Sequence, residues 1–510
     1  VINWGDGKYD TLPRVSISPL TAYIQKNEYV GRHTFSGAGT FIISMVDPNR
    51  VEGILNIDGS VNVPFCLLDT FIIFDQLLFG VNSSPVLLNP PIDFANVGEL
   101  FIHNPAAFDA DGDSLSYELV VPFQYPGIVV PGYQYPDDYT ECPTDVFSIN
   151  SVTGDVIWDV PCIEGIFNIA ILITEYREGI VMGTILRDME IFVEKTNNHA
   201  PVIAEVNDTC VFAGEELNLL VSATDPDVLQ TITLTADGGP FFIDISPAEF
   251  FSTPDQAYVE GTFSWNTVCD HVRDQFYQVV FKAEDDFQLG FDVIPLVDLE
   301  TWLIYVVAPP PQIIDAVPTA NQITVTWQDV YECAGAENFL GFSVWRRIGC
   351  DSIQFDKCQR GLSGTGYDSL AFVGNVYEYI DGSVVYGQEY SYRVVAEFGE
   401  HSEIAPEFIY NRVASAPSDN VCAELKRDLP IINHASVNTT SATNGSVYVG
   451  WYKPLGTDLD TTIFLPPYKY EVLRYDGFDG TGTETIIATF TAASFYTLTD
   501  SSYVDTLINT

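Results

Sequence analysis

The stretch Phe108-Asp109-Ala110-Asp111-Gly112-Asp113-Ser114-Leu115 alternates three carboxylates with small residues, directly ahead of a strand-like run at 115–120. Such a loop can aim several oxygen atoms at one point, which is the arrangement that a hard cation needs. A shorter version, Asp225-Pro226-Asp227, occurs later in the chain. The surroundings of the two loops show whether they are copies of one unit.

The two loops lie in matched surroundings. An Asn-x-x-Pro-Val motif precedes each loop, beginning at Asn82 and Asn198, and each asparagine lies 27 residues before the first aspartate. Three further matches follow in the same order: Gly98-Glu99 with Gly214-Glu215, Gly154-x3-Trp158-x3-Cys162 with Gly261-x3-Trp265-x3-Cys269, and the alternating runs 167–175 and 277–285. The chain therefore contains a tandem repeat, with repeat one at 82–196 and repeat two at 197–308.

Length and composition restrict the class of protein. The chain has 510 residues, of which 46% are hydrophobic, enough for several domains that each have a core. Asp and Glu number 70 against 21 Lys and Arg, so the formal charge is −49. This charge argues against nucleic acid as a partner, because phosphate contacts need clustered Lys and Arg. It suits divalent cations, and it would equally serve to keep a long β-protein monomeric.

The cysteines indicate an oxidising, extracytoplasmic setting. Eight of the nine fall in even sets within the proposed units, and none forms a Cys-x-x-Cys zinc motif. Cys66 is left over, either free or paired outside this sequence. The preferred pairs are Cys142–Cys162 and Cys210–Cys269, and three pairings stay open among Cys333, Cys350, Cys358 and Cys422.

Short alternating runs dominate the chain, and helical periodicity is almost absent. Runs such as Ile323-Thr324-Val325-Thr326-Trp327 are separated by Asp-Gly, Asn-Gly and Pro turns. This pattern is typical of serial β-sandwiches. The predicted fold is an all-β, elongated tandem array of Ig-like sandwiches. No apolar run is long enough to span a bilayer, so the chain is not expected to cross a membrane itself.

The first three units resemble known surface modules. Residues 1–81, the opening unit, resemble a PKD domain, which is marked by a W-G-D-G turn, here Trp4–Gly7, and by H-T-F, here His33–Phe35. The family has strands before that turn, so we expect the unit to begin outside this sequence. The two repeats resemble cadherin-like or Ig-like bacterial surface modules, through the linker 197–202 and the turn Thr153-Gly154.

The remaining chain resembles fibronectin type III domains. The fourth unit, 309–424, follows a Pro309–Pro311 linker and contains Trp327 and a Tyr390-x-Tyr392-x-Val394 run. The last unit, 425–510, repeats the opening of that module, and we expect its final strands beyond the sequence. The order of units resembles the very large gliding-motility-associated surface proteins of Bacteroidota. That resemblance implies export by the type IX system and partners in the outer-membrane machinery, other surface proteins, polysaccharide or other cells.

A calcium site follows from the expected topology. In a seven-stranded sandwich, the entering linker and two of the loops lie at one pole, where crowded carboxylates repel one another unless a cation is present. We expect one set of ligands at the pole of repeat one and a second at the pole of repeat two, with Glu99 facing the second. The candidates are Asn82, Asp109, Asp111, Asp113 and Glu175 in repeat one, and Asn198, Asp225, Asp227 and Asp285 in repeat two. The alternative is that these motifs are ordinary turns.

Catalytic motifs are missing from the sequence. The six histidines are scattered over different units, with no H-E-x-x-H and no G-x-S-x-G. We therefore expect a non-catalytic extracellular stalk, adhesin or surface-filament segment, not an enzyme, with the two repeats stacked head to tail. The alternative is a polysaccharide-binding or accessory array of a secreted hydrolase. A third possibility is polymerisation by strand donation between incomplete end units.

Overall fold

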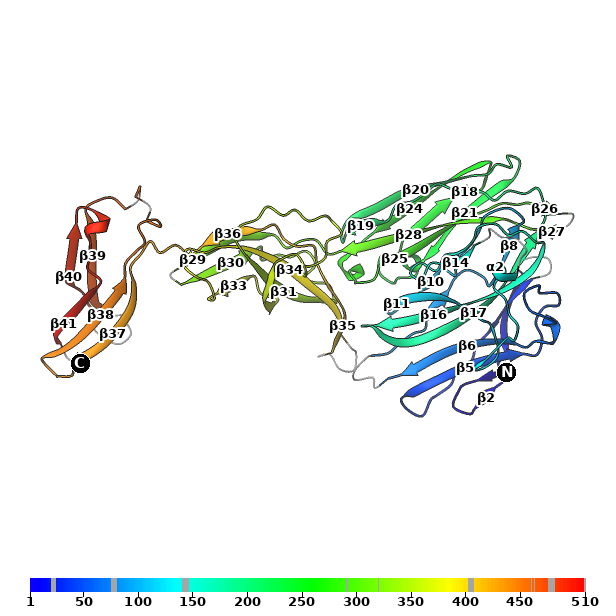
Figure 1. Cartoon of the computed structure of the whole chain (residues 1–510), viewed down its shortest axis with the longest axis horizontal. Coiled ribbons are helices and arrows are strands. Elements are labelled where there is room, and N and C mark those ends of the chain that lie inside the picture. The colour runs from blue at the N-terminus through cyan, green and yellow to red at the C-terminus, as the bar shows by residue number, and fades with distance from the viewer. Residues whose placement is uncertain are drawn as a thin grey trace.

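A computed structural model describes residues 1–19, 24–74, 80–139, 146–289, 292–319, 321–401, 408–459, 461–462, 464–475 and 482–508. Within these ranges the chain is built of β-strands, and α2 (Pro136–Tyr139) is the only α-helix. Figure 1 shows a broad group of sheets near the N-terminus, followed in line by two narrower units. The predicted all-β, elongated array of Ig-like sandwiches is therefore confirmed. No described helix is long and apolar enough to cross a membrane.

The opening unit and repeat one share one sheet. The order of this sheet is β11 (Ser114–Val120), β16 (Gly165–Arg177), β17 (Ile180–Glu194), β6 (Phe65–Ile73), β5 (Gly39–Asp47), β1 (Ile2–Asn3) and β2 (Tyr9–Asp10). Strand β6 pairs with β17, and Arg50 forms a buried ion pair with Asp188 across the two units at 2.6 Å. The boundary at 81/82 thus marks a change of sequence pattern and does not separate two sandwiches.

A second sheet completes repeat one. It consists of β14 (Phe147–Ile149), β15 (Val156–Trp158) and β9 (Phe101–His103), while β7 (Val86–Leu87) pairs with β10 (Ala107–Phe108). Trp158 and Phe167 pack edge to face between the two sheets, with ring centroids 4.9 Å apart. The Gly-x3-Trp motif therefore places its tryptophan in the core, as its strand-like surroundings predicted.

Repeat two has the same plan. One sheet has the order β18 (Val202–Ile203), β20 (Glu216–Thr224), β24 (Tyr258–Asn266) and β22 (Glu249–Ser252), and the other β19 (Thr209–Phe212), β28 (Val297–Val307), β25 (Tyr277–Glu284), β21 (Thr231–Gly238) and β23 (Asp255–Gln256). The parallel pairing of β19 with β28 matches that of β8 (Ile92–Asn96) with β17 in repeat one. Trp265 is buried like Trp158.

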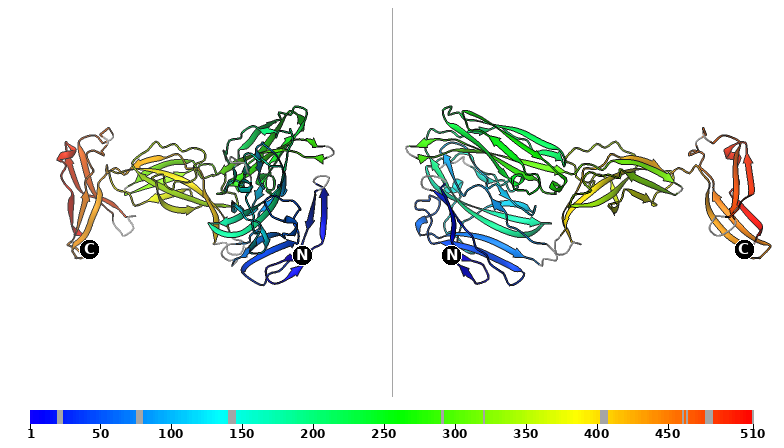
Figure 2. Two further views of the ribbon diagram at one scale, coloured as in Figure 1. Left: turned by 45° about the vertical axis from the view of Figure 1, so that its right-hand side comes forward. Right: turned by 180° about the vertical axis from the view of Figure 1, so that it is seen from behind.

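The two repeats lie side by side in opposite directions. Val280 and Leu299, on the outer face of repeat two, are buried against Ala106 of repeat one. Phe108, beside the acidic loop of repeat one, stacks on Phe242, at the end of repeat two opposite its own acidic loop. At the other end, His199 lies 3.9 Å from Glu99. The predicted head-to-tail stack is therefore wrong, because apolar residues at outward positions of β25 and β28 bring the repeats together along their length (Figures 1 and 2).

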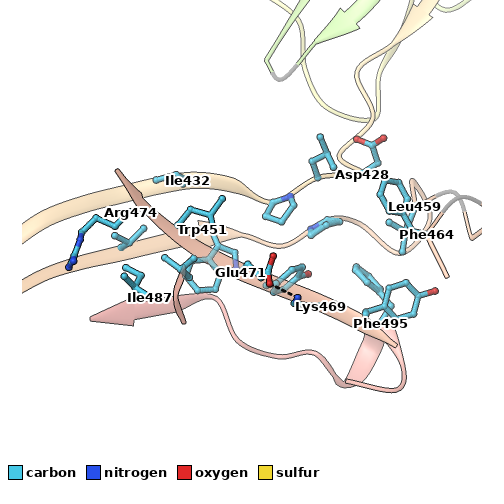
Figure 3. Close-up of a pocket in the computed structure, with 18 of the residues that line it drawn as sticks. Asp428, Ile432, Trp451, Leu459, Phe464, Lys469, Glu471, Arg474, Ile487 and Phe495 are labelled. Atoms are coloured by element: carbon cyan, nitrogen blue, oxygen red, sulfur yellow. Dashed lines mark ion pairs between the residues drawn. The ribbon is translucent and has the colours of Figure 1, made fainter. Parts of the chain in front are cut away.

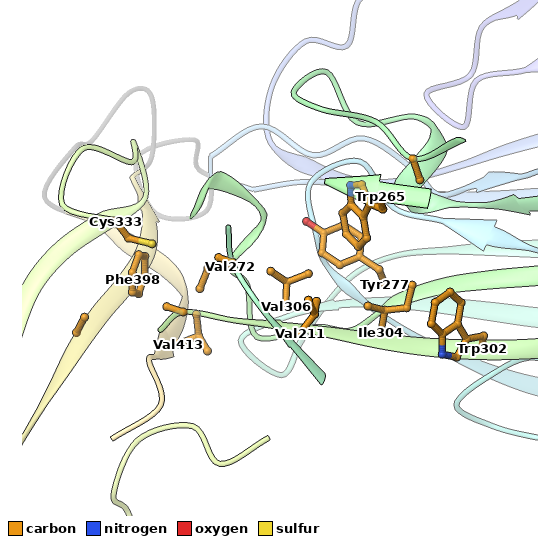
Figure 4. Packing of buried hydrophobic residues seen from close by; sticks show 14 of the residues in the cluster. Val211, Trp265, Val272, Tyr277, Trp302, Ile304, Val306, Cys333, Phe398 and Val413 are labelled. Carbon is orange, nitrogen blue, oxygen red and sulfur yellow. The ribbon is translucent and has the colours of Figure 1, made fainter. Parts of the chain in front are cut away.

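The fourth unit is a sandwich of two sheets. One has the order β29 (Ile313–Thr319), β30 (Gln322–Trp327) and β33 (Glu378–Asp381); the other has β32 (Asp368–Gly374), β31 (Phe339–Ile348), β34 (Glu389–His401) and β35 (Ile409–Ala414), with β36 (Val421–Glu424) also on β34. A single apolar cluster runs from repeat two into this unit. Figure 4 shows Val272 and Val306 of repeat two near Phe398 and Val413 of the fourth unit.

Two disulfides cross the joint between repeat two and the fourth unit. They are Cys210–Cys358 and Cys269–Cys333, whereas Cys350–Cys422 lies within the fourth unit. The predicted Cys210–Cys269 pair is wrong, because both cysteines lie at the end of repeat two that meets the fourth unit and each faces a different loop of it. The Cys142–Cys162 pair stays a prediction, since Cys142 lies outside the described residues. Cys66 is free and buried.

The last unit repeats part of the fourth. Its sheets are β37 (Ile431–Thr439), β38 (Gly445–Tyr452) and β41 (Ser502–Ile508), and β39 (Tyr468–Tyr475) with β40 (Glu484–Ala492). Arg474 binds Asp505 as Arg346 binds Asp381 in the fourth unit, which supports the internal duplication. Between the sheets lies an apolar cavity of about 990 Å³ that contains Trp451 and Phe464 (Figure 3). In the fourth unit, buried residues of β34 such as Tyr392 and Val394 belong to the core that contains Trp327.

Candidate metal centre

Three carboxylates meet at the pole of repeat one that holds the acidic loop 109–113. The ligand atoms of Asp109, Asp113 and Glu175 all lie within 4.8 Å of one another, and all three residues are buried. Strand pairing explains the convergence, because Leu115 of β11 lies opposite Glu175 of β16 and the Asp109–Asp113 loop leads into β11. This is the only such group of His, Cys, Asp and Glu side chains among the described residues.

The opening unit covers the other side of the centre. Gly183 of β17 lies opposite Glu175 of β16 and also pairs with Phe71 of β6. A Cβ added at Gly183 would lie 3.3 Å from the Glu175 carboxylate and 3.0 Å from the carbonyl oxygen of Thr70. Glu175 is only 1% exposed as a result. Burial of this carboxylate thus depends on the shared sheet.

The loop satisfies some of its oxygen atoms and leaves others without a donor. Asp109 Oδ1 accepts the backbone N–H groups of Asp111 and Asp113, both at 3.0 Å, and Asp111 Oδ2 accepts that of Ser83. Within the described structure, no hydrogen bond of good geometry reaches Asp109 Oδ2 or either carboxylate oxygen of Glu175, although the Asn82 amide lies near enough to oppose the rise in the pKa of Glu175. Buried polar atoms are normally paired, so these three oxygens mark an incomplete site.

Burial also disfavours the charged state of these carboxyl groups. Desolvation, the largest cause, raises the pKa of Asp109 to about 7, although its backbone hydrogen bonds oppose the shift. Desolvation likewise raises the pKa of Glu175 far above its ordinary value, and the neighbouring Asp113 and Asp109 add to the effect. A bound divalent cation would remove this penalty by supplying opposite charge.

Arg177 supplies one positive charge beside the centre. Its Nε and Nη2 atoms donate to the two carboxylate oxygens of Asp113 at 2.8 and 2.7 Å, and Nη2 also donates to Asn82 Oδ1 at 3.1 Å. The guanidinium thus pairs with Asp113 and also lies 3.7 Å from Asp111 Oδ2. Sequence reasoning missed Arg177, although it continues the alternation of the 167–175 run by one more step.

Repeat two has a different arrangement at the matching pole. Asn198 Nδ2 donates to Asp285 Oδ2 at 2.8 Å, and Gln230 Nε2 donates to Asn198 Oδ1 at 2.6 Å. Two backbone N–H groups, from Phe287 and Leu296, satisfy Asp285 Oδ1. The position that matches Asp113 is Leu229, which is 84% exposed. Amide groups therefore take the place of a third carboxylate in repeat two.

Glu99 lies beside the pole of repeat two, as the sequence predicted, but a histidine lies between them. His199 is 3.9 Å from Glu99 Oε1 and 3.2 Å from Asp227 Oδ2. The backbone N–H of His199 also donates to Asp227. Asp225 lies nearby, and its Oδ1 accepts the N–H of Asp227 at 2.7 Å. Protein donors thus reach Asp285, Asp227 and one oxygen of Asp225, whereas within the described structure no hydrogen bond reaches Asp225 Oδ2.

No protein-family model matches the sequence, and no curated protein matches it either. Solved structures do match, among them the crystal structure of chicken CNTN1 FN1–FN3 domains. That match is 12% identical, covers 61% of this chain and 88% of the other, and has a TM-score of 0.19. Likeness at this level says nothing about function. The Ig-like assignment comes from the sheets themselves.

Proposed function

We propose that the chain is a non-catalytic extracellular segment of a very large bacterial cell-surface protein that acts in adhesion or gliding. The observation that carries this proposal is the pair of disulfides, Cys210–Cys358 and Cys269–Cys333, that joins successive sandwiches. Disulfides persist outside the cytoplasm, and a cross-linked joint suits a protein under mechanical load. The type IX machinery and other surface components are its proposed partners.

A test of this proposal compares cells that carry the gene with cells that lack it. Surface proteolysis of intact cells should cut the chain in the gene-bearing strain, and loss of the gene should reduce attachment or gliding. A chain that resists proteolysis until the cells are lysed would contradict the surface assignment. Unchanged attachment and unchanged gliding in the deletion strain would contradict the adhesive role.

We also propose that Ca²⁺ binds at Asp109, Asp113 and Glu175. The support is the convergence of three buried carboxylates, which include oxygens that no hydrogen bond of good geometry reaches. Ca²⁺ takes six to eight oxygen ligands in flexible geometry, so these side chains, loop carbonyls and water could hold it. In repeat two, donors from Asn198, Phe287 and Leu296 occupy both oxygens of Asp285. Among the described residues no third carboxylate joins Asp285 and Asp225, so no Ca²⁺ site is proposed there.

Calorimetric titration of the chelated full chain with CaCl₂ tests this site. The wild type should bind Ca²⁺ and melt at a higher temperature when it is bound, whereas Asp109→Asn/Glu175→Gln should show neither effect. Asp225→Asn is the matched control in repeat two and should bind like the wild type. Absence of heat and of any thermal shift in the wild type would reject the site. Loss of binding in Asp225→Asn would move the site to repeat two.

A further inference from the structure

The fourth unit lies directly on the acidic loop of repeat one, although the two are not neighbours in the sequence. The backbone N–H of Asn411 in β35 donates to Glu178 Oε1 at 2.7 Å. Its side-chain Nδ2 donates to the carbonyl oxygen of Asp111 at 3.2 Å. Asn411 has a φ of 51°, a left-handed conformation that asparagine adopts more easily than most residues. Both of its donors thus reach repeat one.

Arg177 connects this contact to the metal centre. Its guanidinium lies 4.7 Å from the ring centroid of Tyr410, the residue before Asn411, while the same group holds both oxygens of Asp113. The side chain of Arg177 is fully buried between these partners. Asp113 therefore faces the metal centre on one side and, through Arg177, the fourth unit on the other.

The tip of the loop reaches a junction of three units. Gly112 has a φ of 77°, and a Cβ there would meet Asn411 of the fourth unit at 3.6 Å and Arg273 of repeat two at 3.7 Å. A cavity of about 500 Å³ lies at this junction and is lined by residues of all three units, including Asp111, Arg273 and Tyr410. A shift of this loop would therefore change its contacts with both the fourth unit and repeat two.

We propose that a divalent cation at Asp109, Asp113 and Glu175 and the seating of β35 on repeat one stabilise each other. This inference rests on the calcium binding proposed above. The cation fixes the loop that presents the Asp111 carbonyl and the Asp113 carboxylate, and these groups hold Asn411 and, through Arg177, Tyr410. By thermodynamic linkage, a seated fourth unit must raise the cation affinity by the same factor. A cation bound at the metal centre thus stabilises the contact between repeat one and the fourth unit, which are separated in the sequence by repeat two.

Calorimetric titration of the full chain with CaCl₂ tests this linkage. Tyr410→Leu/Asn411→Gly removes the ring and the side-chain amide while keeping the backbone N–H and a residue that tolerates φ of 51°. The Kd for Ca²⁺ should rise about fivefold or more, within the usual range of coupling between sites. Phe372→Leu, an exposed aromatic at the opposite edge of the same sheet, is the control and should leave the Kd unchanged.

Hydrogen exchange on the wild type gives a second measurement that needs no variant. Ca²⁺ should slow exchange of the amides of β35, above all that of Asn411, relative to the amides of β32. An unchanged Kd in the double variant, or unchanged exchange in β35 when Ca²⁺ is bound, would overturn the coupling. If the wild type binds no Ca²⁺ at all, the proposed site itself fails, and that result is distinct from binding without coupling.

Discussion

Arg177 sets the balance of charge at the pole of repeat one. Asp109, Asp113 and Glu175 could be predicted from sequence, because the repeat alignment and sandwich topology together placed them at one pole. Arg177 could not be assigned a role, since an alternating strand does not reveal which polar residue turns towards a loop. The predicted Cys210–Cys269 pair was wrong for a related reason. That prediction considered only cysteines within one unit, whereas Cys210 pairs with Cys358 of the next unit.

Replacement of Arg177 should expose this balance. Arg177→Gln removes the guanidinium that pairs with the buried Asp113 carboxylate. Breaking such a buried ion pair lowers the free energy of unfolding by about 3–5 kcal/mol. We expect a marked fall in the denaturant midpoint of the chelated protein and partial recovery when Ca²⁺ is added. The exposed Lys357–Glu215 pair offers a control, because Lys357→Gln should change the unfolding free energy by about 0–1 kcal/mol. Equal effects of the two substitutions would contradict the account.

Asp69 of β6 provides a pH test of the shared sheet. Burial raises its pKa to about 6, so the folded state binds a proton more tightly than the unfolded chain. Its contribution to stability is then fully present below about pH 4 and is lost as the pH rises through about 6. Asp69→Asn should therefore stabilise the chain at pH 7, by about 1–3 kcal/mol, and change little at pH 4. Equal effects at both pH values in thermal melts would contradict this sign.

At the scale of elements, alternation predicted the strands and their inward residues well. Trp158, Trp265 and Trp327 are all buried, as their strand-like patterns implied. The contact between the repeats could not be predicted from β25, because Val280 is apolar but its neighbours Gln278 and Lys282 on the same outward face are polar. The outward face of β28 is more apolar and includes Leu299 and Leu303. A face like that of β25 reads as solvent-exposed until its partner is known.

Val280 therefore tests the packing between the repeats. Val280→Asp would place a carboxylate without a partner against Ala106, and we expect a loss of roughly 3 kcal/mol or more in unfolding free energy. Leu220→Asp is the control, since Leu220 is 62% exposed on the other sheet of repeat two and should tolerate the charge. Chemical denaturation measures both. A tolerated Val280→Asp would mean that this face is open to solvent.

At the scale of the whole molecule, the array is elongated but its first units form a compact head. The opening unit shares a sheet with repeat one, repeat two folds back along it, and the fourth unit is tied to repeat two by two disulfides. The proline linker lies within this assembly, where Tyr331 donates to the carbonyl of Pro309 at 2.7 Å. The spacing of motifs along the sequence could predict the number of units, but it could not predict that repeat two packs side by side with repeat one.

The distance between spin labels at positions 152 and 275 tests the fold-back most directly. Val152 of repeat one and Gln275 of repeat two line the same cavity. Pulsed electron paramagnetic resonance on the spin-labelled Val152→Cys/Gln275→Cys variant should therefore give a short, narrow distribution of distances between the two labels. A head-to-tail stack would place them roughly 70–80 Å apart, because each sandwich is about as long as its longest strands. A short distance supports the side-by-side head, and a separation near two sandwich lengths would contradict it.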